Sequence, residues 1–323
     1  MKVTRLAAFV VAALALASGW AMLARAETWP QRPVRFFIPF GPGAGADIGA
    51  RLLQEGLQKR WEKPMVVENR PGGDSMMAIQ AFLRVNDDHT FLWSPSGNFT
   101  VHPYLYQQLP YDPADIVPIA RFSNTILAVG VPASMKINTL KELVERVRAA
   151  PGTFNETAVP GITDFAFDYL AKTEGLVVQK VPYRDTVQAA VDLGEGRIQI
   201  YASSYAILRP RTEAGQIKIL AVMGRERAPS LPEIPTAAEA GFPALEMEGL
   251  VGLFGIKGMS DALRERIAAD IIAVSSEAGV GAKLVSTAQT LNPGGPSEFA
   301  QSIARQRERI AIIAQAVRIE PKQ

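Results

Sequence analysis

Short loops that precede several of the predicted helices are the part of the sequence best suited to chemistry. Three contain glycine, Gly43-x-Gly45-x-Asp47, Gly72-Gly73-Asp74-Ser75 and Gly161-x-Thr163-Asp164, and a fourth, Tyr183-Arg184-Asp185-Thr186, does not. The first N–H groups of a helix have no partner within the helix, and the helix dipole gives them partial positive charge. Because small residues let a ligand approach this backbone closely, such loops can bind an anion such as a carboxylate.

Ordinary helix capping explains each of these loops equally well when it is taken alone. Asp, Ser and Thr are preferred at helix N-termini, where a cap contributes about 0.5–2 kcal/mol. In open α/β sheets, however, ligands bind at the carboxyl ends of the strands, where such loops lie. The four loops therefore predict a shared anion site on the condition that they converge, which the sequence does not show.

The sequence gives little support to a catalytic function. It contains no cysteine and only two histidines, His89 and His102, which we expect to be solvated in a turn and a loop. A G-x-S-x-G nucleophile motif, a histidine metal spacing and the lysine of a phosphate-binding P-loop are all absent from it. We therefore predict no catalytic residue, no metal and no cofactor. An exported hydrolase or isomerase that uses Asp74 or Asp164 as acid or base stays open as an alternative.

Strands and helices are predicted to alternate from about residue 30 onward. The predicted strands are Val34–Pro39, Met65–Glu68, Thr90–Ser94, Ile126–Val131, Phe154–Val159, Val177–Val181, Ile198–Tyr201, Ile217–Val222 and Leu250–Ile256. The predicted helices are Asp47–Arg60, Ser75–Arg84, Thr139–Ala149, Thr163–Thr173, Thr186–Leu193, Asp261–Ser275 and Ser297–Ala314. Loops are expected to dominate the stretch between residues 94 and 126. Such alternation is typical of mostly parallel α/β layers, and the number of units favours two lobes over one sheet.

The N-terminus has the layout of a secretory signal peptide. Lys2 and Arg5 are followed by an apolar run from Leu6 to Ala17, and Ala24-Arg25-Ala26 is a small-x-small cleavage site. A membrane anchor is the alternative, but the apolar run is short for a span of about 20 residues. With 34 basic and 32 acidic residues, the chain also lacks the basic excess of a nucleic-acid surface. We expect a protein that is exported to the periplasm and cleaved after Ala26.

Several short motifs, taken together, resemble the Bug-type receptors, the substrate-binding components of tripartite tricarboxylate transporters. They are Trp29-Pro30-x-Arg32-Pro33-Val34-Arg35, Pro39-Phe40-Gly41-Pro42-Gly43, Val67-Glu68-Asn69-Arg70-Pro71-Gly72, Leu109-Pro110-Tyr111-Asp112-Pro113, Val181-Pro182-Tyr183 and Leu231-Pro232-x-Ile234-Pro235-Thr236. The resemblance implies a two-lobed periplasmic binding protein, or Venus flytrap of the type II kind, with two crossing strands near residues 124–131 and 248–256. One lobe would hold residues 27–125 and 248–323, and the other residues 126–247.

The resemblance also implies a set of ligand-binding residues and a set of partners. The ligand would be a small organic acid held mainly by backbone N–H groups and hydroxyls, and the partners would be the permease subunits of a tripartite transporter. A sensory receptor that signals to a membrane kinase is the alternative, and we expect a monomer. The implied ligand-binding residues are Phe40, Gly41, Gly43, Ala44, Gly45, Ala46, Asp47, Gly73, Asp74, Ser75, Ser94, Ser96, Gly97, Asn98, Pro160, Gly161, Ile162, Thr163, Asp164, Tyr183, Arg184, Asp185, Ser203 and Ser204.

Two acidic residues depart from the family pattern. Asp74 and Asp164 stand where small or hydroxyl residues are common in the family, and Phe165 replaces a frequent histidine. Like charges repel strongly in a low-dielectric site, so the added acids should disfavour a second or third ligand carboxylate. We therefore predict a monocarboxylate, or an amphoteric or aromatic acid, as ligand in preference to citrate.

Overall fold

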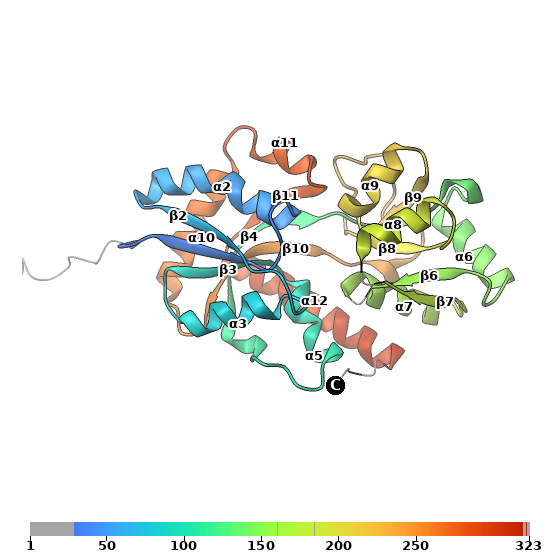
Figure 1. Cartoon of the computed structure of the whole chain (residues 1–323), viewed down its shortest axis with the longest axis horizontal. Coiled ribbons are helices and arrows are strands. Elements are labelled where there is room, and N and C mark those ends of the chain that lie inside the picture. Colours follow the sequence, from blue (N-terminus) through green and yellow to red (C-terminus); the bar gives the residue numbers. More distant parts are fainter. Residues whose placement is uncertain (1–28, 160, 184, 319–320, 322–323) are drawn as a thin grey trace, which may run out of the picture.

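The protein folds into two α/β lobes that lie side by side along its longest axis (Figure 1). The structure, a computed structural model, describes residues 29–159, 161–183, 185–318 and 321. The predicted signal peptide therefore lies outside the described residues. Each lobe has its own sheet with helices packed against it, and strands pass from one lobe to the other. The predicted two-lobed fold with crossing strands is confirmed.

The first lobe is built on a six-stranded mixed sheet with the order β11-β4-β10-β3-β1-β2. Strand β1 pairs in parallel with both β2 and β3, whereas β10 runs antiparallel to β3 and β4. The strands are β1 (Val34–Ile38), β2 (Met65–Asn69), β3 (Thr90–Pro95), β4 (Ile116–Thr125), β10 (Gly249–Ile256) and β11 (Gln289–Gly294). Because β1, β2 and β3 are parallel, their carboxyl ends meet at one edge of this sheet.

Both faces of this sheet are covered by helices. Phe36 of β1 packs in a cluster with α2 and α10, while its neighbour Phe37 packs with α3 and α12 on the other face, as the alternation along a strand requires. The helices of the first lobe are α2 (Gly45–Trp61), α3 (Met76–Val85), α4 (Gly97–Thr100), α5 (His102–Leu105), α10 (Asp261–Ser275), α11 (Val280–Val285) and α12 (Pro296–Val317), with a 3₁₀ turn η1 (Pro113–Asp115).

The second lobe contains a three-stranded and a two-stranded sheet. The first has the order β8-β5-β9, and the second pairs β6 with β7 in parallel. The strands are β5 (Leu127–Pro132), β6 (Asn155–Ala158), β7 (Gln179–Pro182), β8 (Tyr201–Ser204) and β9 (Ile217–Val222). The helices are α6 (Leu140–Ala149), α7 (Ile162–Thr173), α8 (Thr186–Gly194) and α9 (Tyr205–Glu213), with 3₁₀ turns η2 (Ala133–Met135) and η3 (Pro243–Leu245).

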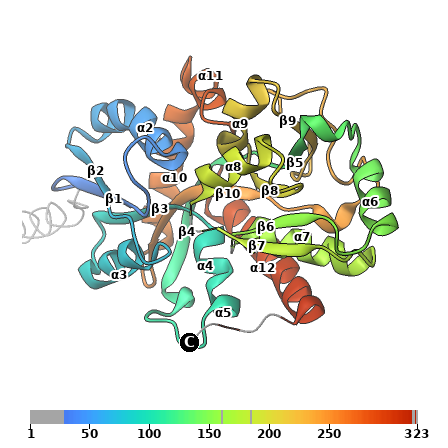
Figure 2. The same ribbon diagram turned by 45° about the vertical axis from the view of Figure 1, so that its right-hand side comes forward.

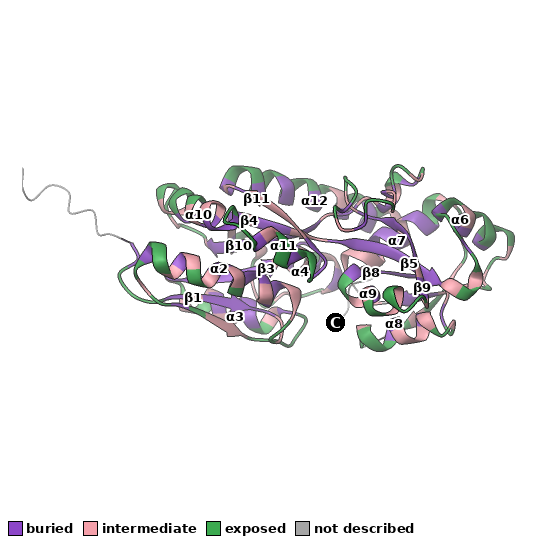
Figure 3. Ribbon diagram, turned by 90° about the horizontal axis from the view of Figure 1, so that it is seen from above, coloured by how far each residue is buried: buried purple, intermediate pink, exposed green. Residues whose placement is uncertain are grey.

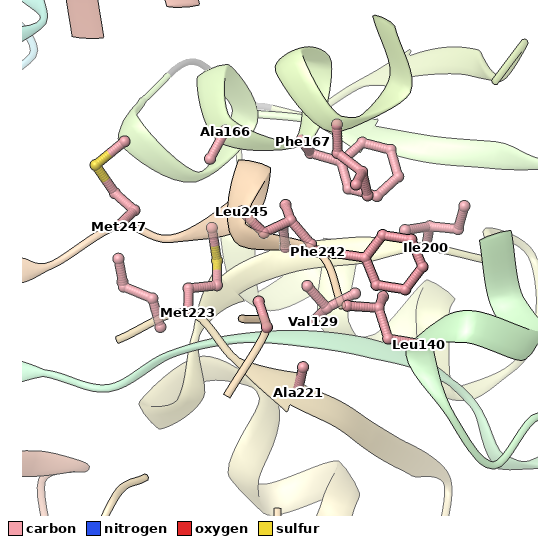
Figure 4. Packing of buried hydrophobic residues seen from close by; sticks show 14 of the residues in the cluster. Val129, Leu140, Ala166, Phe167, Ile200, Ala221, Met223, Phe242, Leu245 and Met247 are labelled. Carbon is pink, nitrogen blue, oxygen red and sulfur yellow. The ribbon is translucent and has the colours of Figure 1, made fainter. Parts of the chain in front are cut away.

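The core of the second lobe is continuous with part of the C-terminal helix. Buried side chains from β5, α6, α7 and η3 form one apolar cluster, in which Val129, Leu140, Phe167 and Leu245 face one another (Figure 4). Ile310 and Ile313 of α12 belong to this same cluster, whereas Phe299 and Ile303 of the same helix pack on the first lobe. Helix α12 therefore contacts both lobes. Buried residues are concentrated along the strands of both lobes (Figure 3).

Several elements differ from those predicted. The stretch expected to be rich in loops contains β4, the longest strand of the first sheet, and the sequence analysis did not predict β11 or α9. Strand β8 begins at Tyr201, where the predicted strand ends. His89 and His102 are 5% and 2% exposed, so the expectation that they are solvated was wrong. His102 is buried because it packs between Tyr106 and Tyr111.

Candidate functional site

The carboxyl ends of β1, β2 and β3 face the second lobe. A Cβ atom added to Gly97, just after β3, would lie 3.1 Å from Cγ2 of Ile162, the first residue of α7. The loop after β3, which contains the predicted residues Ser96, Gly97 and Asn98, is therefore in contact with the predicted loop at the start of α7. Figure 2 shows these strands of the first lobe running toward β6, β7 and α7 of the second. We refer to the two facing surfaces as the interlobe face.

The first loop is held in shape by the carboxylate of Asp47. This side chain is 2% exposed and accepts hydrogen bonds from the backbone N–H of Gly43 at 2.9 Å, from Arg51 at 3.0 Å and from Asn69 at 2.9 Å. Burial opposes the charged form, yet these donors hold the pKa of Asp47 below its usual value. The same Asn69 amide donates to the carbonyl of Phe40 at 2.9 Å, so the ends of β1 and β2 are tied together.

Three of the predicted glycines border open space. Among the described residues, a Cβ atom at Gly41 or Gly43 would meet nothing within 4 Å, and one at Gly161 would meet only the Val159 carbonyl oxygen at 4.0 Å. Gly43 has φ +86°, a conformation that favours glycine. Gly45 is different, because its Cβ would lie 3.0 Å from the Gln289 side chain. The small size of Gly45 allows α2 to pack closely against β11. Gly41, Gly43 and Gly161, by contrast, leave their backbone accessible.

The second loop has an unusual backbone and an acid with close neighbours. Asp74 and Ser75 have φ values of +51° and +72°. The hydroxyl of Tyr106 donates to Asp74 Oδ2 at 2.9 Å, and Nε2 of His102 lies 3.6 Å from the same oxygen. Burial and the Asp74 carboxylate raise the pKa of Tyr106 to about 12. The loop is thereby tied to α5.

The loop after β3 is held in place by the side chain of Gln306 on α12. Its Oε1 accepts from the hydroxyls of Ser96 at 2.7 Å and Thr100 at 3.0 Å, and its Nε2 donates to the carbonyl of Glu248 at 2.8 Å. Asn98 in turn donates to the Ser94 hydroxyl at 3.1 Å. The predicted residues Ser94, Ser96 and Asn98 are thus engaged with their own chain. Gln306 could not be predicted from the sequence, because nothing in a single amphipathic helix marks one buried glutamine.

In the second lobe, the first turn of α7 carries a cluster of charges. The ammonium of Lys180 on β7 lies 2.6 Å from Asp164 and 2.5 Å from Asp168, both on α7, and 3.6 Å from Glu156 on β6. Glu156 is fully buried, and burial raises its pKa well above the usual value although Lys180 opposes this. Burial disfavours the charged form of Lys180, but the three acids outweigh it and raise its pKa. Lys180 is therefore charged at neutral pH.

The remaining predicted residues of the second lobe surround α8 and the end of β8. Asp185 caps α8 by accepting from the N–H groups of Val187 and Gln188 at 2.8 and 3.2 Å. The Tyr183 hydroxyl donates to Asp192 at 2.6 Å, and burial together with this carboxylate raises the pKa of Tyr183 to about 12. Ser203 and Ser204 end β8, next to Leu127 and Ala128 of β5. The predicted residues Pro160 and Arg184 lie outside the described residues.

Ordinary side-chain capping accounts for one of the four helix starts. Asp185 is a regular cap, whereas the N-cap residues of α2, α3 and α7, which are Ala44, Ser75 and Gly161, make no side-chain capping bond. Helix starts of this kind leave N–H groups for another acceptor. This favours the anion-site interpretation for three loops over the capping alternative, while direct ligand contact of individual residues stays a prediction.

A cavity that the sequence did not predict lies beside the crossing strands. It has a volume of about 550 Å³ and is lined by Asn124–Leu127, by the segment Gly224–Pro229 of the second lobe and by Thr290–Asn292 of the first. None of the predicted ligand-binding residues that the structure describes lines it. Because both lobes contribute walls, the shape of this cavity depends on the angle between them.

The chain belongs to the tripartite tricarboxylate transporter family receptors, because the model of that family matches residues 49–315. Among curated relatives, BugT of Bordetella pertussis is 29% identical over 248 residues, which cover 75% of this chain and 76% of that protein. A UPF0065 protein from the tcbD-tcbE intergenic region of Pseudomonas sp. (strain P51) is 29% identical over 264 residues, or 80% of this chain and 78% of the relative.

Solved structures have the same fold. Rpa4515 of R. palustris, solved with adipate, has a TM-score of 0.78 at 24% identity and covers 91% of this chain and 100% of its own. MatC of Rhodopseudomonas palustris, solved with bound malate, has a TM-score of 0.71 at 22% identity, with coverage of 90% and 100%. The periplasmic binding protein BugD has a TM-score of 0.74 at 22% identity, with coverage of 91% and 100%. Membership of this family identifies the chain as a receptor and not an enzyme, and the similar structures show that it has the fold of a periplasmic binding protein. Within the described part of the chain, no helix has the length and apolar character to cross a bilayer.

Proposed function

We propose that this receptor binds a small organic carboxylate between its two lobes and delivers it to a tripartite tricarboxylate-type transporter in the periplasm. The main support for binding between the lobes is the contact of Gly97 with Ile162, which brings the loop after β3 against the start of α7. Three helix starts without side-chain caps supply N–H groups at or near this face. Two proteins of similar fold were solved with adipate and with malate, which is consistent with an organic acid as ligand.

The ligand would be held by closure of the lobes. In this proposal, residues 27–125 and 248–323 form one moving part and residues 126–247 the other, after removal of residues 1–26. Rotation occurs about the crossings at Thr125–Leu127 and at Glu248–Gly249. A ligand stabilises the closed form only by contacting both parts, so the site includes the loops of both lobes. A sensory role uses the same closure, and adjacent genes for permease subunits would favour transport.

The test begins with purified residues 27–323. Mass spectrometry of small molecules released on denaturation identifies a retained acid, and calorimetry then measures binding of adipate, hexanoate, malate, benzoate and citrate. We expect one-to-one saturation by at least one of the acids, with no depletion of ligand over time. Failure to retain or bind any organic acid would overturn the proposal, and steady consumption of ligand would favour an enzyme. Tight binding of citrate would contradict the preference for few carboxylates.

A variant locates the site. Gly161→Asp places a carboxylate at the start of α7, where the added side chain enters open space. A like charge close to a bound anion should weaken binding by about tenfold or more. Val177→Asp is the control, because Val177 is 55% exposed on the same lobe and precedes β7. Equal affinity of the two variants would place the ligand elsewhere.

A further inference from the structure

The cluster around Lys180 has more negative than positive groups and is partly shut off from water. Carboxylate oxygens of Glu156, Asp164 and Asp168 all lie within 4.8 Å of one another. Glu156 is fully buried, and among the described residues neither of its carboxylate oxygens accepts a hydrogen bond. Burial favours the neutral form of Glu156, but the two aspartates require a cation in such a setting, and the ammonium of Lys180 lies among the three acids at 2.5–3.6 Å.

This cluster adjoins the start of α7, which in the proposed function contributes N–H groups to the ligand-binding site. Asp164 is in the first turn of α7, which begins at Ile162 after the uncapped Gly161. Its side chain is 14% exposed, so the protein screens its charge less than water would. An unpaired carboxylate here would cancel the positive end of the helix dipole and repel an incoming anion.

We propose that Lys180 is a specificity-determining residue, which neutralises Asp164 and so allows the start of α7 to accept a ligand carboxylate. This role rests on the proposed function. It changes the expectation drawn from the sequence, in which Asp164 was a repulsive charge. With Lys180 in place, Asp164 repels a ligand carboxylate less than its charge suggests. The number of carboxylates that a ligand can carry and still bind then depends on the opposing charges of these two residues.

The balance has a measurable consequence. Lys180→Met removes the positive charge that lies between Asp164 and Asp168, so a ligand meets one more net negative charge. At a separation of about 10 Å and an effective dielectric constant of about 20, one charge changes affinity by about tenfold per ligand charge. We therefore expect Lys180→Met to weaken hexanoate about tenfold and adipate, with its second carboxylate, by up to about a hundredfold. Asp164→Asn should have the opposite sign and tighten adipate more than hexanoate.

The experiment measures the affinities of adipate and hexanoate for the wild type, Lys180→Met, Asp164→Asn and the double variant. The double variant should regain most of the lost affinity, because it removes both charges. Lys172→Met is the control, since Lys172 is exposed eight residues further along α7, about 12 Å from Asp164. A merely structural role of Lys180 would weaken both acids equally and would not be rescued by Asp164→Asn.

The outcomes separate the two proposals. If the wild type binds no organic acid, the proposed function fails and this inference fails with it. If the wild type binds, but Lys180→Met and Asp164→Asn leave the affinities within about twofold, only the inference is overturned. If Lys180→Met does not fold, Asp164→Asn decides alone by whether affinity rises. If the wild type binds only monocarboxylates, hexanoate alone decides. The inference then requires Lys180→Met to weaken hexanoate binding and Asp164→Asn to strengthen it.

Discussion

Replacing Gln306 by alanine tests whether this side chain supports the loop after β3. The change removes the acceptor shared by the hydroxyls of Ser96 and Thr100 and the donor to the carbonyl of Glu248. Ser96 is 0% exposed and Thr100 is 2% exposed, so water does not replace the lost partner. At about 1 kcal/mol for each bond with a buried partner left unpaired, Gln306→Ala should reduce the free energy of unfolding by about 3 kcal/mol.

The assay is urea unfolding followed by tryptophan fluorescence. The four tryptophans are at positions 20, 29, 61 and 93, so in purified residues 27–323 the signal reports the first lobe, where the loop lies. Circular dichroism on the same samples shows whether the second lobe unfolds in the same transition. Gln301→Ala is the matched control, an exposed glutamine on the same helix. If both variants lose the same stability, within about 0.5 kcal/mol, Gln306 does not support the loop.

Two further predictions concern single positions. Gly252→Ala should cost several kcal/mol or prevent soluble expression, because its Cβ would lie 2.2 Å from the Ala120 carbonyl oxygen; Gly281→Ala, whose Cβ meets only ordinary contacts at 3.6 Å, is the control for unfolding measurements. Glu156→Gln should flatten the pH dependence of stability. Because burial raises the pKa of Glu156 in the folded state, its contribution is present below its usual pKa of 4.5 and is lost as pH rises toward the folded value. If the pH dependence of Tm is the same in Glu156→Gln as in the wild type, the pKa of Glu156 is not raised in the folded state.

The periodic parts of the fold could be predicted from the sequence because their local patterns agree with their environment. Helix α2 buries Ala46, Ala50, Leu53 and Leu57 at helical spacing, which the apolar residues indicate directly. The parallel strand β1 is an almost continuous apolar run, as a strand covered on both faces should be. For the candidate site, the same reasoning found the helix starts, since glycine and acidic residues mark them locally.

The missed elements are those in which distant pairing overrides local signals. Strand β4 contains Pro118 and several polar residues, and it is a strand because it pairs with β10 along its length, with irregular register in two places. Strand β11, Gln-Thr-Leu-Asn-Pro-Gly, has the composition of a turn. The partners of the site residues were missed for the same reason, since Lys180 lies 16 residues from Asp164 and Gln306 lies 210 residues from Ser96.

Helix α12 limits how the lobes can move relative to each other. Its first half packs on the first lobe through Phe299 and Ile303, and its second half belongs to the core of the second lobe through Ile310 and Ile313. Between the halves, Arg309 donates to the carbonyls of η3 at 2.7–2.9 Å. A helix is stiffer than the extended crossings, so rotation of one lobe must shift the packing of one half of α12. Gln306 lies next to this junction and also holds the loop after β3, so the position of that loop and the angle between the lobes are set by the same helix.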